Sequence, residues 1–320
     1  MNFEASRNWR RFLELFLISF LTLYFELIII RWVSSEVRVF AYLKNLPLIA
    51  SFLGMGLGCA CARSRTNYSR HFPMITAVLC AVIACSGKLG ITFLPFPSAD
   101  YLIVGDVTGG FDFSTLSNKL LALSKFLATV LAVFSLCVAM FLALGQKLGR
   151  LLNEFPPLIA YSINITGSLL GVLVFSAISF AGWSPLVWFA IGFALLIGLL
   201  PNWKSSVVAF AATLLIIRIA PSQASWSPYY RIDLSPIRAT GAGASSPIVG
   251  HNLGVNHDYF QRMLDLSKDA VSTEFTERGR AYYNLIYQFV RPERVLVVGA
   301  GSGNDVAAAL RRHAGSTDPV

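Results

Sequence analysis

The 320-residue sequence has little charge. Charged residues make up 13% of the chain and hydrophobic residues 55%, whereas a soluble globular chain carries about 25% charged residues. This shortage argues against an ordinary soluble domain. The apolar residues also cluster into long runs, so we predict an integral membrane protein in contact with a lipid bilayer.

The sequence also lacks the patterns of a metal or disulfide site. Its five cysteines lie inside apolar runs, none belongs to a C-x-x-C pair, and no histidine cluster is nearby. We interpret them as buried thiols that act as small hydrophobic side chains. No metal site is predicted. The cysteines are Cys59, Cys61, Cys80, Cys85 and Cys137.

Excess positive charge is confined to the apolar part. The formal net charge is +9, but the chain from Trp226 onward holds ten Lys/Arg and nine Asp/Glu. A nearly neutral tail argues against nucleic-acid binding. Basic loops beside an anionic membrane face explain the charge better.

Seven apolar stretches are candidates for membrane-spanning helices, which need about 20 residues each. The last two are short, and the sequence 201–204 separates them, so we predict six or seven spans within a membrane domain of residues 1–220. The candidates are 12–32, 45–62, 73–95, 120–145, 157–180, 184–200 and 205–220.

Basic and acidic loops alternate along the chain. Residues 7–11, 63–70 and 147–150 are basic, whereas 96–118 holds three aspartates and no basic residue. The positive-inside rule therefore places the N-terminus inside and 96–118 outside. An even number of spans would return the tail to the inside, and an odd number would leave it outside.

Polar and small residues within the spans allow two interpretations. Glu26, Lys88 and Asn164 are either structural pairs or the lining of a transport path, because polar groups in lipid need partners. The G-x-x-x-G stretches 54–58 and 167–171 predict close helix packing inside the bundle. A dimer seam or a substrate path is the alternative.

The tail changes in composition at Pro221. Residues 221–250 are rich in Ser, Pro and Gly and contain two strand-like runs, 229–234 and 247–253, which predict a linker with a β-hairpin. Residues 251–320 are predicted to begin an α/β domain. Its first helix is expected over 274–290, where apolar residues recur at helical spacing.

A glycine-rich turn follows in the tail. Residues 294–298 predict a buried strand and 304–312 predict a helix, with Gly299, Gly301 and Gly303 between them. This order places free backbone N–H groups at the turn, which is typical of nucleotide-cofactor sites. The dinucleotide fingerprint would require glycine at Asn304. The structural alternative is an ordinary tight strand–helix connection.

The G-x-G-x-G turn resembles the first motif of S-adenosylmethionine-dependent methyltransferases and aminopropyltransferases. Residues 227–232 resemble the S-P-Y-Q-x-I strand of spermidine synthases, and 277–284 occupy the place of their D-E-x-x-Y-H-E segment. Residues 160–167 resemble the Y-A-x-N-x-x-G span of bacterial membrane-fused spermidine-synthase-like proteins. The order of the segments also resembles this family.

The resemblance implies a helical membrane bundle, a small β element and an incomplete Rossmann-like domain in a bacterial inner membrane, with a cytoplasmic tail. S-adenosylmethionine or its decarboxylated form would be the cofactor, and an amine or another nucleophile the acceptor. Tyr230, Tyr283 and Asn284 replace polar groups of the family and put polyamine specificity in doubt. The site residues implied are Gly299, Gly301, Gly303 and Asp305 for the cofactor, and Tyr229 and Tyr282 for the acceptor.

The family's catalytic Asp would lie beyond Val320. We therefore expect no transferase activity from this chain alone, and a homodimer or a partner chain could complete the α/β fold. Two other functions stay open. One is a transporter with a regulatory tail, and the other is a structural membrane subunit whose tail docks on a partner.

Overall fold

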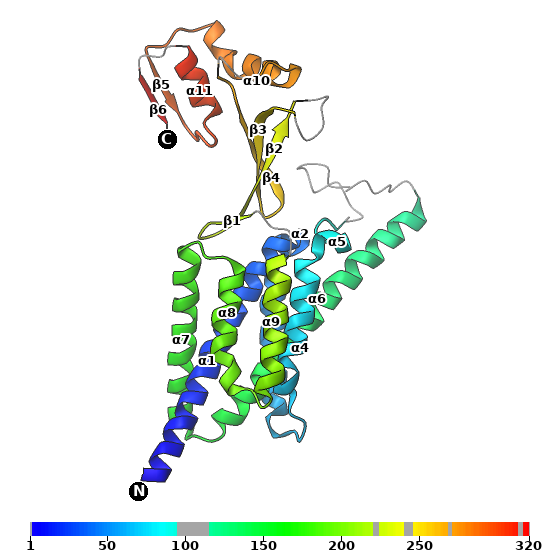
Figure 1. The fold of residues 1–320 in the computed structure, drawn as a ribbon, viewed down its shortest axis with the longest axis vertical. Helices are drawn as coiled ribbons and strands as arrows, with labels where there is room; N and C mark the ends of the chain where they lie inside the picture. The colour runs from blue at the N-terminus through cyan, green and yellow to red at the C-terminus, as the bar shows by residue number, and fades with distance from the viewer. Residues whose placement is uncertain are drawn as a thin grey trace. The chain divides into compact units, whose positions relative to one another are not determined.

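The computed structural model describes residues 2–94, 115–219, 224–239, 246–267, 271–312 and 316–319. The chain forms two compact units, Met1–Arg231 and Ile232–Val320, and each is described by itself. The first is helical and the second carries most of the β structure (Figure 1). The predicted aspartate-rich loop falls mainly within 95–114, outside the described residues.

The first unit is built from helices joined by short turns. Its α-helices are α1 (Asn2–Glu36), α2 (Arg38–Tyr42), α3 (Asn45–Ala60), α4 (Phe72–Ala84), α5 (Ser86–Leu89), α6 (Leu116–Leu152), α7 (Pro157–Phe180), α8 (Pro185–Leu196) and α9 (Trp203–Ile219). Its 3-10 turns are η1 (Cys61–Arg63), η2 (Tyr68–His71) and η4 (Ile197–Leu199).

Among the described residues, four helical segments are long and apolar enough to cross a membrane. They are Asn8–Glu36, Asn45–Arg63, Leu116–Leu152 and Pro157–Phe180. Two shorter apolar segments, Tyr68–Ala84 and Pro185–Leu199, lie beside them. The sequence-based prediction of a membrane protein is thus supported by helix length and composition.

The predicted span over 73–95 is shorter in the structure. Helix α4 ends at Ala84, and the four-residue helix α5 follows after Cys85. The chain turns there because Gly90 adopts a φ of +63° and Thr92 Oγ1 donates to Ser86 Oγ at 2.9 Å. Ser86 is buried, which fixes the break against the bundle.

The bundle has two ends that side-chain contacts define. At the N-terminal end, Arg11 pairs with Glu154 at 3.4 Å and Lys147 bonds the Leu199 carbonyl. At the linker end, Ser86 Oγ donates to the Glu36 carbonyl at 3.5 Å, and Trp226 lies near Glu36 in the lining of one cavity. We use these two names below.

Seven helices of the described first unit run between these ends: α1, α3, α4, α6, α7, α8 and α9 (Figure 1). The basic segments 7–11, 63–70 and 147–150 gather at the N-terminal end, as the alternation of loops predicts. The linker leaves from the opposite end, where Arg31 contacts Ser227. If all seven helices cross the membrane, the N-terminus and the tail lie on opposite sides of it. They cannot then both be cytoplasmic.

The apolar core surrounds α1. Its side chains are buried on every face of the helix, among them Leu15, Leu21, Phe25 and Ile29, which are 0% exposed. A helix that is apolar all round belongs in the centre of a bundle. The structure thus places the first predicted span in the centre of the bundle.

Both G-x-x-x-G stretches pack inside the bundle. A methyl group on Gly58 would lie 2.5 Å from the Leu142 carbonyl oxygen of α6, and one on Gly167 would lie 2.6 Å from the Phe16 carbonyl oxygen of α1. Such distances leave room for hydrogen alone. Internal packing thus accounts for both stretches.

A buried glutamine fixes the loop between α3 and α4. Gln146 is 0% exposed, and its amide donates to the carbonyls of Cys61 at 3.0 Å and Thr66 at 2.8 Å. Its oxygen accepts from Tyr68 N at 2.7 Å. One turn later, Arg150 donates to the Ser64 carbonyl at 2.9 Å. The Gln146 amide thus supplies hydrogen-bond partners to backbone groups of the segment between α3 and α4.

The four-stranded sheet has the order β1-β2-β3-β4, and its three long strands are antiparallel (Figure 1). The expected hairpin is β2 with β3, and β4 is an additional strand. The turn between β3 and β4 places Asn256 and His257 at φ values of 51° and 67°, as a two-residue hairpin loop requires. The strands are β1 (Ser225–Trp226), β2 (Arg231–Arg238), β3 (Ile248–Val255) and β4 (Asp258–Leu264).

At the end of the second unit, a strand, a helix and a second strand follow one another along the chain, and the two strands pair in parallel. Strand β5 (Arg294–Val297) leads through the glycine turn to α11 (Asn304–Arg311), and β6 (Ser316–Pro319) pairs with β5 in parallel. We expected one strand and one helix. The described residues thus show a two-stranded parallel sheet, not a doubly wound Rossmann sheet. The expected helix 274–290 is α10 (Glu274–Asn284) followed by η5 (Ile286–Gln288).

Candidate functional site

The glycine turn has the backbone that its sequence predicts. Gly299, Gly301 and Gly303 have φ values of +70°, +51° and +81°. Side chains other than glycine rarely adopt this region. The turn is closed by a hydrogen bond from Gly303 N to the Ala300 carbonyl at 2.8 Å, and the first N–H groups of α11 have no partner within the helix.

The three glycines differ in what surrounds them. A methyl group on Gly299 or Gly303 would meet nothing within 4 Å, so both lie beside open space. One on Gly301 would lie 2.9 Å from Cδ of Gln261, a residue of β4. The end of the Gln261 side chain therefore covers the turn at Gly301, whereas Gly299 and Gly303 leave space for a ligand to approach. Sequence analysis did not identify Gln261.

Asn304 attaches the turn to β4. It is 5% exposed, and its amide donates to the Arg262 carbonyl at 2.7 Å and to the Tyr283 hydroxyl at 3.0 Å. Its oxygen accepts from Leu264 N at 3.1 Å. The residue that breaks the dinucleotide fingerprint thus holds three elements together.

Two departures from the spermidine-synthase pattern have structural partners. Tyr283 accepts from Asn304, and the Asn284 oxygen accepts from Arg311 Nη2 at 3.3 Å. Both side chains therefore link α10 to α11.

An open groove of about 450 Å³ runs beside β5. It is lined mainly by apolar residues of η5 and β5, together with Tyr287. Burial and, less strongly, the nearby Asp305 carboxylate raise the pKa of Tyr287. Sequence analysis did not identify Tyr287, whose phenol stands beside this apolar wall.

The acceptor candidates belong to different units. Tyr229 lies in the first unit and is 77% exposed, and Tyr282 lies on α10 in the second and is 75% exposed. The rings of Tyr282 and Tyr283 stack edge to face at 5.3 Å. The described structure does not join Tyr229 and Tyr282 into one site.

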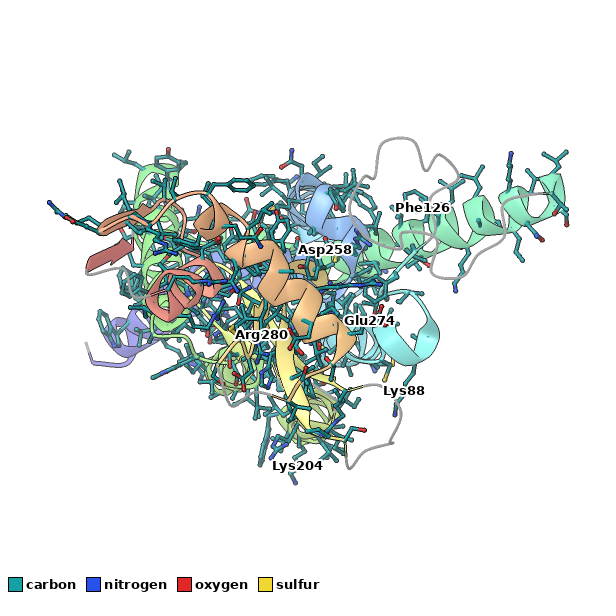
Figure 2. All side chains as sticks on the ribbon, turned by 90° about the horizontal axis from the view of Figure 1, so that it is seen from above. Lys88, Phe126, Lys204, Asp258, Glu274 and Arg280 are labelled. Carbon is teal, nitrogen blue, oxygen red and sulfur yellow. The ribbon has the colours of Figure 1, made fainter. Side chains whose placement is uncertain are left out.

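The three candidates predicted within the spans, Glu26, Asn164 and Lys88, have different surroundings. Glu26 is 3% exposed on α1 and shares a hydrogen bond with Ser51 of α3, and its Oε2 has no partner in the described part of the chain. Asn164 on α7 has a buried Oδ1 without a partner there. Lys88, by contrast, is exposed on α5 and points outward (Figure 2). Lys88 lies beyond the end of α4, so the predicted span over 73–95 is not one continuous helix at this residue.

Comparisons of the chain with protein-family models, with curated proteins and with solved structures found no match.

Proposed function

We propose that the chain is the membrane-anchored part of a spermidine-synthase-like transferase that binds S-adenosylmethionine or its decarboxylated form. The observation that carries the proposal is the turn between β5 and α11. Three glycines there have positive φ, two of them beside open space, and a helix N-terminus follows. Backbone N–H groups in this arrangement suit an anionic or hydroxyl-bearing ligand.

The residues around the turn suggest a division of roles. Gly299 and Gly303 would let the cofactor approach the backbone, and Asp305 would accept from its hydroxyl or ammonium groups. Tyr287 and the apolar wall of the β5 groove would contact its flat, less polar part. Gly301 and Asn304 would keep the turn on β4. Transfer itself would need the acceptor and a base near the cofactor.

Binding of labelled S-adenosylmethionine and its decarboxylated form to the purified full chain tests this proposal. Saturable binding that D305N weakens supports it. The matched control is E274Q, which removes a carboxylate that is exposed on α10 and pairs only locally with Arg278 at 2.5 Å. Failure of both cofactors to bind, or equal loss in D305N and E274Q, would refute it.

A cytosolic cofactor also requires a cytoplasmic tail, so the proposal places the linker end of the bundle toward the cytoplasm of a bacterial inner membrane. The N-terminal end would then face the other side, against the distribution of basic residues. Sidedness of the tail is therefore a second, independent test.

One observation favours a partner-docking tail instead. Apolar side chains of β5 and its neighbours are exposed, among them Leu296 at 65%, Val298 at 79% and Phe289 at 77%. A parallel sheet is normally covered on both faces. A chain that co-purifies in fixed proportion, and is lost on substitution of Val298 by Lys, would support this function. A tail that stays monomeric would count against it.

A further inference from the structure

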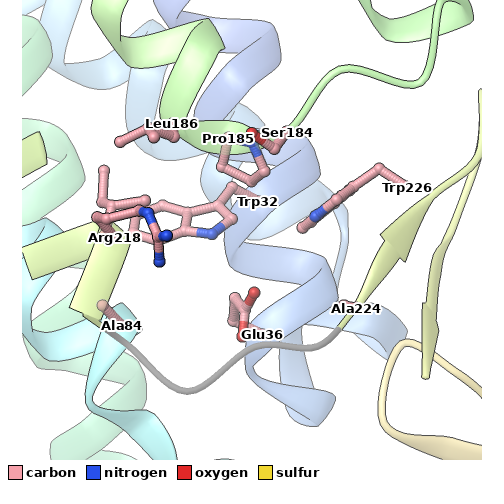
Figure 3. A pocket seen from close by; sticks show the side chains of 10 residues that line it. Trp32, Glu36, Ala84, Ser184, Pro185, Leu186, Arg218, Ala224 and Trp226 are labelled. Carbon is pink, nitrogen blue, oxygen red and sulfur yellow. The ribbon is translucent and has the colours of Figure 1, made fainter. Parts of the chain in front are cut away.

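A cavity of about 260 Å³ opens at the linker end of the first unit (Figure 3). Aromatic and aliphatic side chains from α1, α8, α9 and the linker form most of its wall, with Trp32 and Trp226 the largest. Its volume equals that of roughly nine water molecules at about 30 Å³ each. It is therefore large enough for a small organic group and too small for a long acyl chain.

Two charged side chains line this cavity. Glu36 ends α1 and pairs with Arg231 at 3.3 Å, where Arg231 is 4% exposed. Arg218 enters from the last turn of α9 and forms no ion pair with any described residue. The carboxylate thus has a cationic partner of its own, and the Arg218 guanidinium is left to attract a negative group.

A third guanidinium lies behind the cavity wall. Arg31 lies over the rings of Trp188 and Trp226, at 4.7 and 5.7 Å from their centroids, and donates to the Ser227 carbonyl at 2.5 Å. Its Nε and Nη1 are buried and have no acceptor in the described part of the chain. Three guanidiniums and the one Glu36 carboxylate therefore lie at this end among these side chains, and the local charge favours an anion.

We propose that this cavity binds the phosphate group of an amphiphilic organic anion. The Arg218 guanidinium would hold the phosphate through charge-assisted hydrogen bonds. The Ser184 hydroxyl would donate to the same group, while Trp32 and Trp226 cover the less polar part of the ligand. The source is either the headgroup of an anionic lipid or a soluble phosphate ester. The inference concerns the first unit and does not depend on the transferase proposal.

Melting temperatures of the purified full chain in detergent test the site. We expect phosphatidylglycerol to raise the melting temperature more than phosphatidylcholine, because binding to the native state stabilises it. Phenyl phosphate and inorganic phosphate are the soluble probes. A shift with phosphatidylglycerol alone identifies a lipid site, and an equal shift with phenyl phosphate identifies a soluble ligand.

Two substitutions in α9 make the result specific. R218Q should weaken binding about tenfold, the usual effect of losing a charge-assisted hydrogen bond. K204Q is the matched control, because Lys204 has the same charge on the same helix at its other end. R218K should restore part of the binding and shows that the fold tolerates the position. The proposal is overturned if no phosphate compound shifts melting, or if R218Q and K204Q behave alike.

Discussion

Asn304 donates from its amide to the Arg262 carbonyl at 2.7 Å and joins the start of α11 to β4. The contact fixes the glycine turn on the antiparallel sheet of the second unit. A glycine at this position would complete the dinucleotide fingerprint but remove the contact. The residue that departs from the fingerprint therefore has a role in packing.

Substitution N304A should loosen β4 in the second unit. It leaves Leu264 N without its acceptor and removes one of the two side-chain donors to the Arg262 carbonyl, at a cost of about 2 kcal/mol. Amide exchange of Leu264 should then accelerate roughly thirtyfold. Hydrogen exchange followed by mass spectrometry measures it.

The control for this change is S302A, since Ser302 Oγ donates to the same carbonyl at 2.9 Å from an exposed position. S302A should accelerate the amide exchange of Leu264 several-fold less than N304A does. Equal acceleration in both variants would show that Asn304 has no special role.

Alanine substitution at two glycines of α3, Gly58 and Gly56, should change the folding stability in opposite directions. In G58A the new methyl group meets the backbone of α6, and overpacking of this kind costs about 1–3 kcal/mol. In G56A it meets nothing within 4 Å, and the higher helix propensity of alanine favours the folded state. Thermal unfolding in detergent compares them. Similar melting temperatures would mean that α3 and α6 do not approach as described.

Substitution Q146L should destabilise the loop between α3 and α4. The leucine is similar in volume but leaves Tyr68 N without its acceptor, at a cost of about 1–3 kcal/mol. The Cys61 and Thr66 carbonyls each lose one donor and keep Ser64 N and Arg150 Nη2. Limited proteolysis at 61–68 and thermal unfolding report the loss. T166A is the control, because the exposed Thr166 hydroxyl bonds only its own helix through the Ser162 carbonyl. A Q146L chain as resistant as T166A would contradict the assigned contact.

Acid should weaken the segment before α10. The side chain and the backbone N–H of Ser267 hydrogen-bond the Asp265 carboxylate and lower its pKa. A lowered folded-state pKa contributes stability above the unfolded value near 3.9, and this is lost as pH falls through the folded pKa. The protection factor of Ser267 N, which corrects for the slower intrinsic exchange in acid, should fall between pH 5 and 3 more in the parent than in D265N. Equal pH profiles would exclude the contribution.

The elements that sequence predicts best are those with a local cause. Apolar runs predict the long helices, and the three glycines predict the turn between β5 and α11. What the sequence missed depends on contacts between distant segments. Gln146 is one of several polar residues in α6, and only the fold shows the loop that it bonds. Gln261 and Tyr287 carry no signal in the sequence. Their positions matter only because β4 packs against the turn and η5 lines the groove beside β5.

The hairpin turn of β3 and β4 escaped prediction for another reason. Asn256-His257 adopts the positive φ values of a two-residue loop without the glycine that usually marks it. The end of α4 was missed because apolar residues continue past Ala84, while buried hydrogen bonds of Ser86 turn the chain. Composition cannot report such a break.

The central claim is that the chain crosses the membrane with its N-terminal and linker ends on opposite faces. Cysteine-free variants carrying either T66C or S225C test it, because Thr66 and Ser225 are exposed at opposite ends of the bundle. We predict that a membrane-impermeant thiol reagent labels one of the two in intact cells and the other only after permeabilisation. Labelling of both from the same side would contradict the account, and labelling of S225C from outside would refute the proposed use of a cytosolic cofactor.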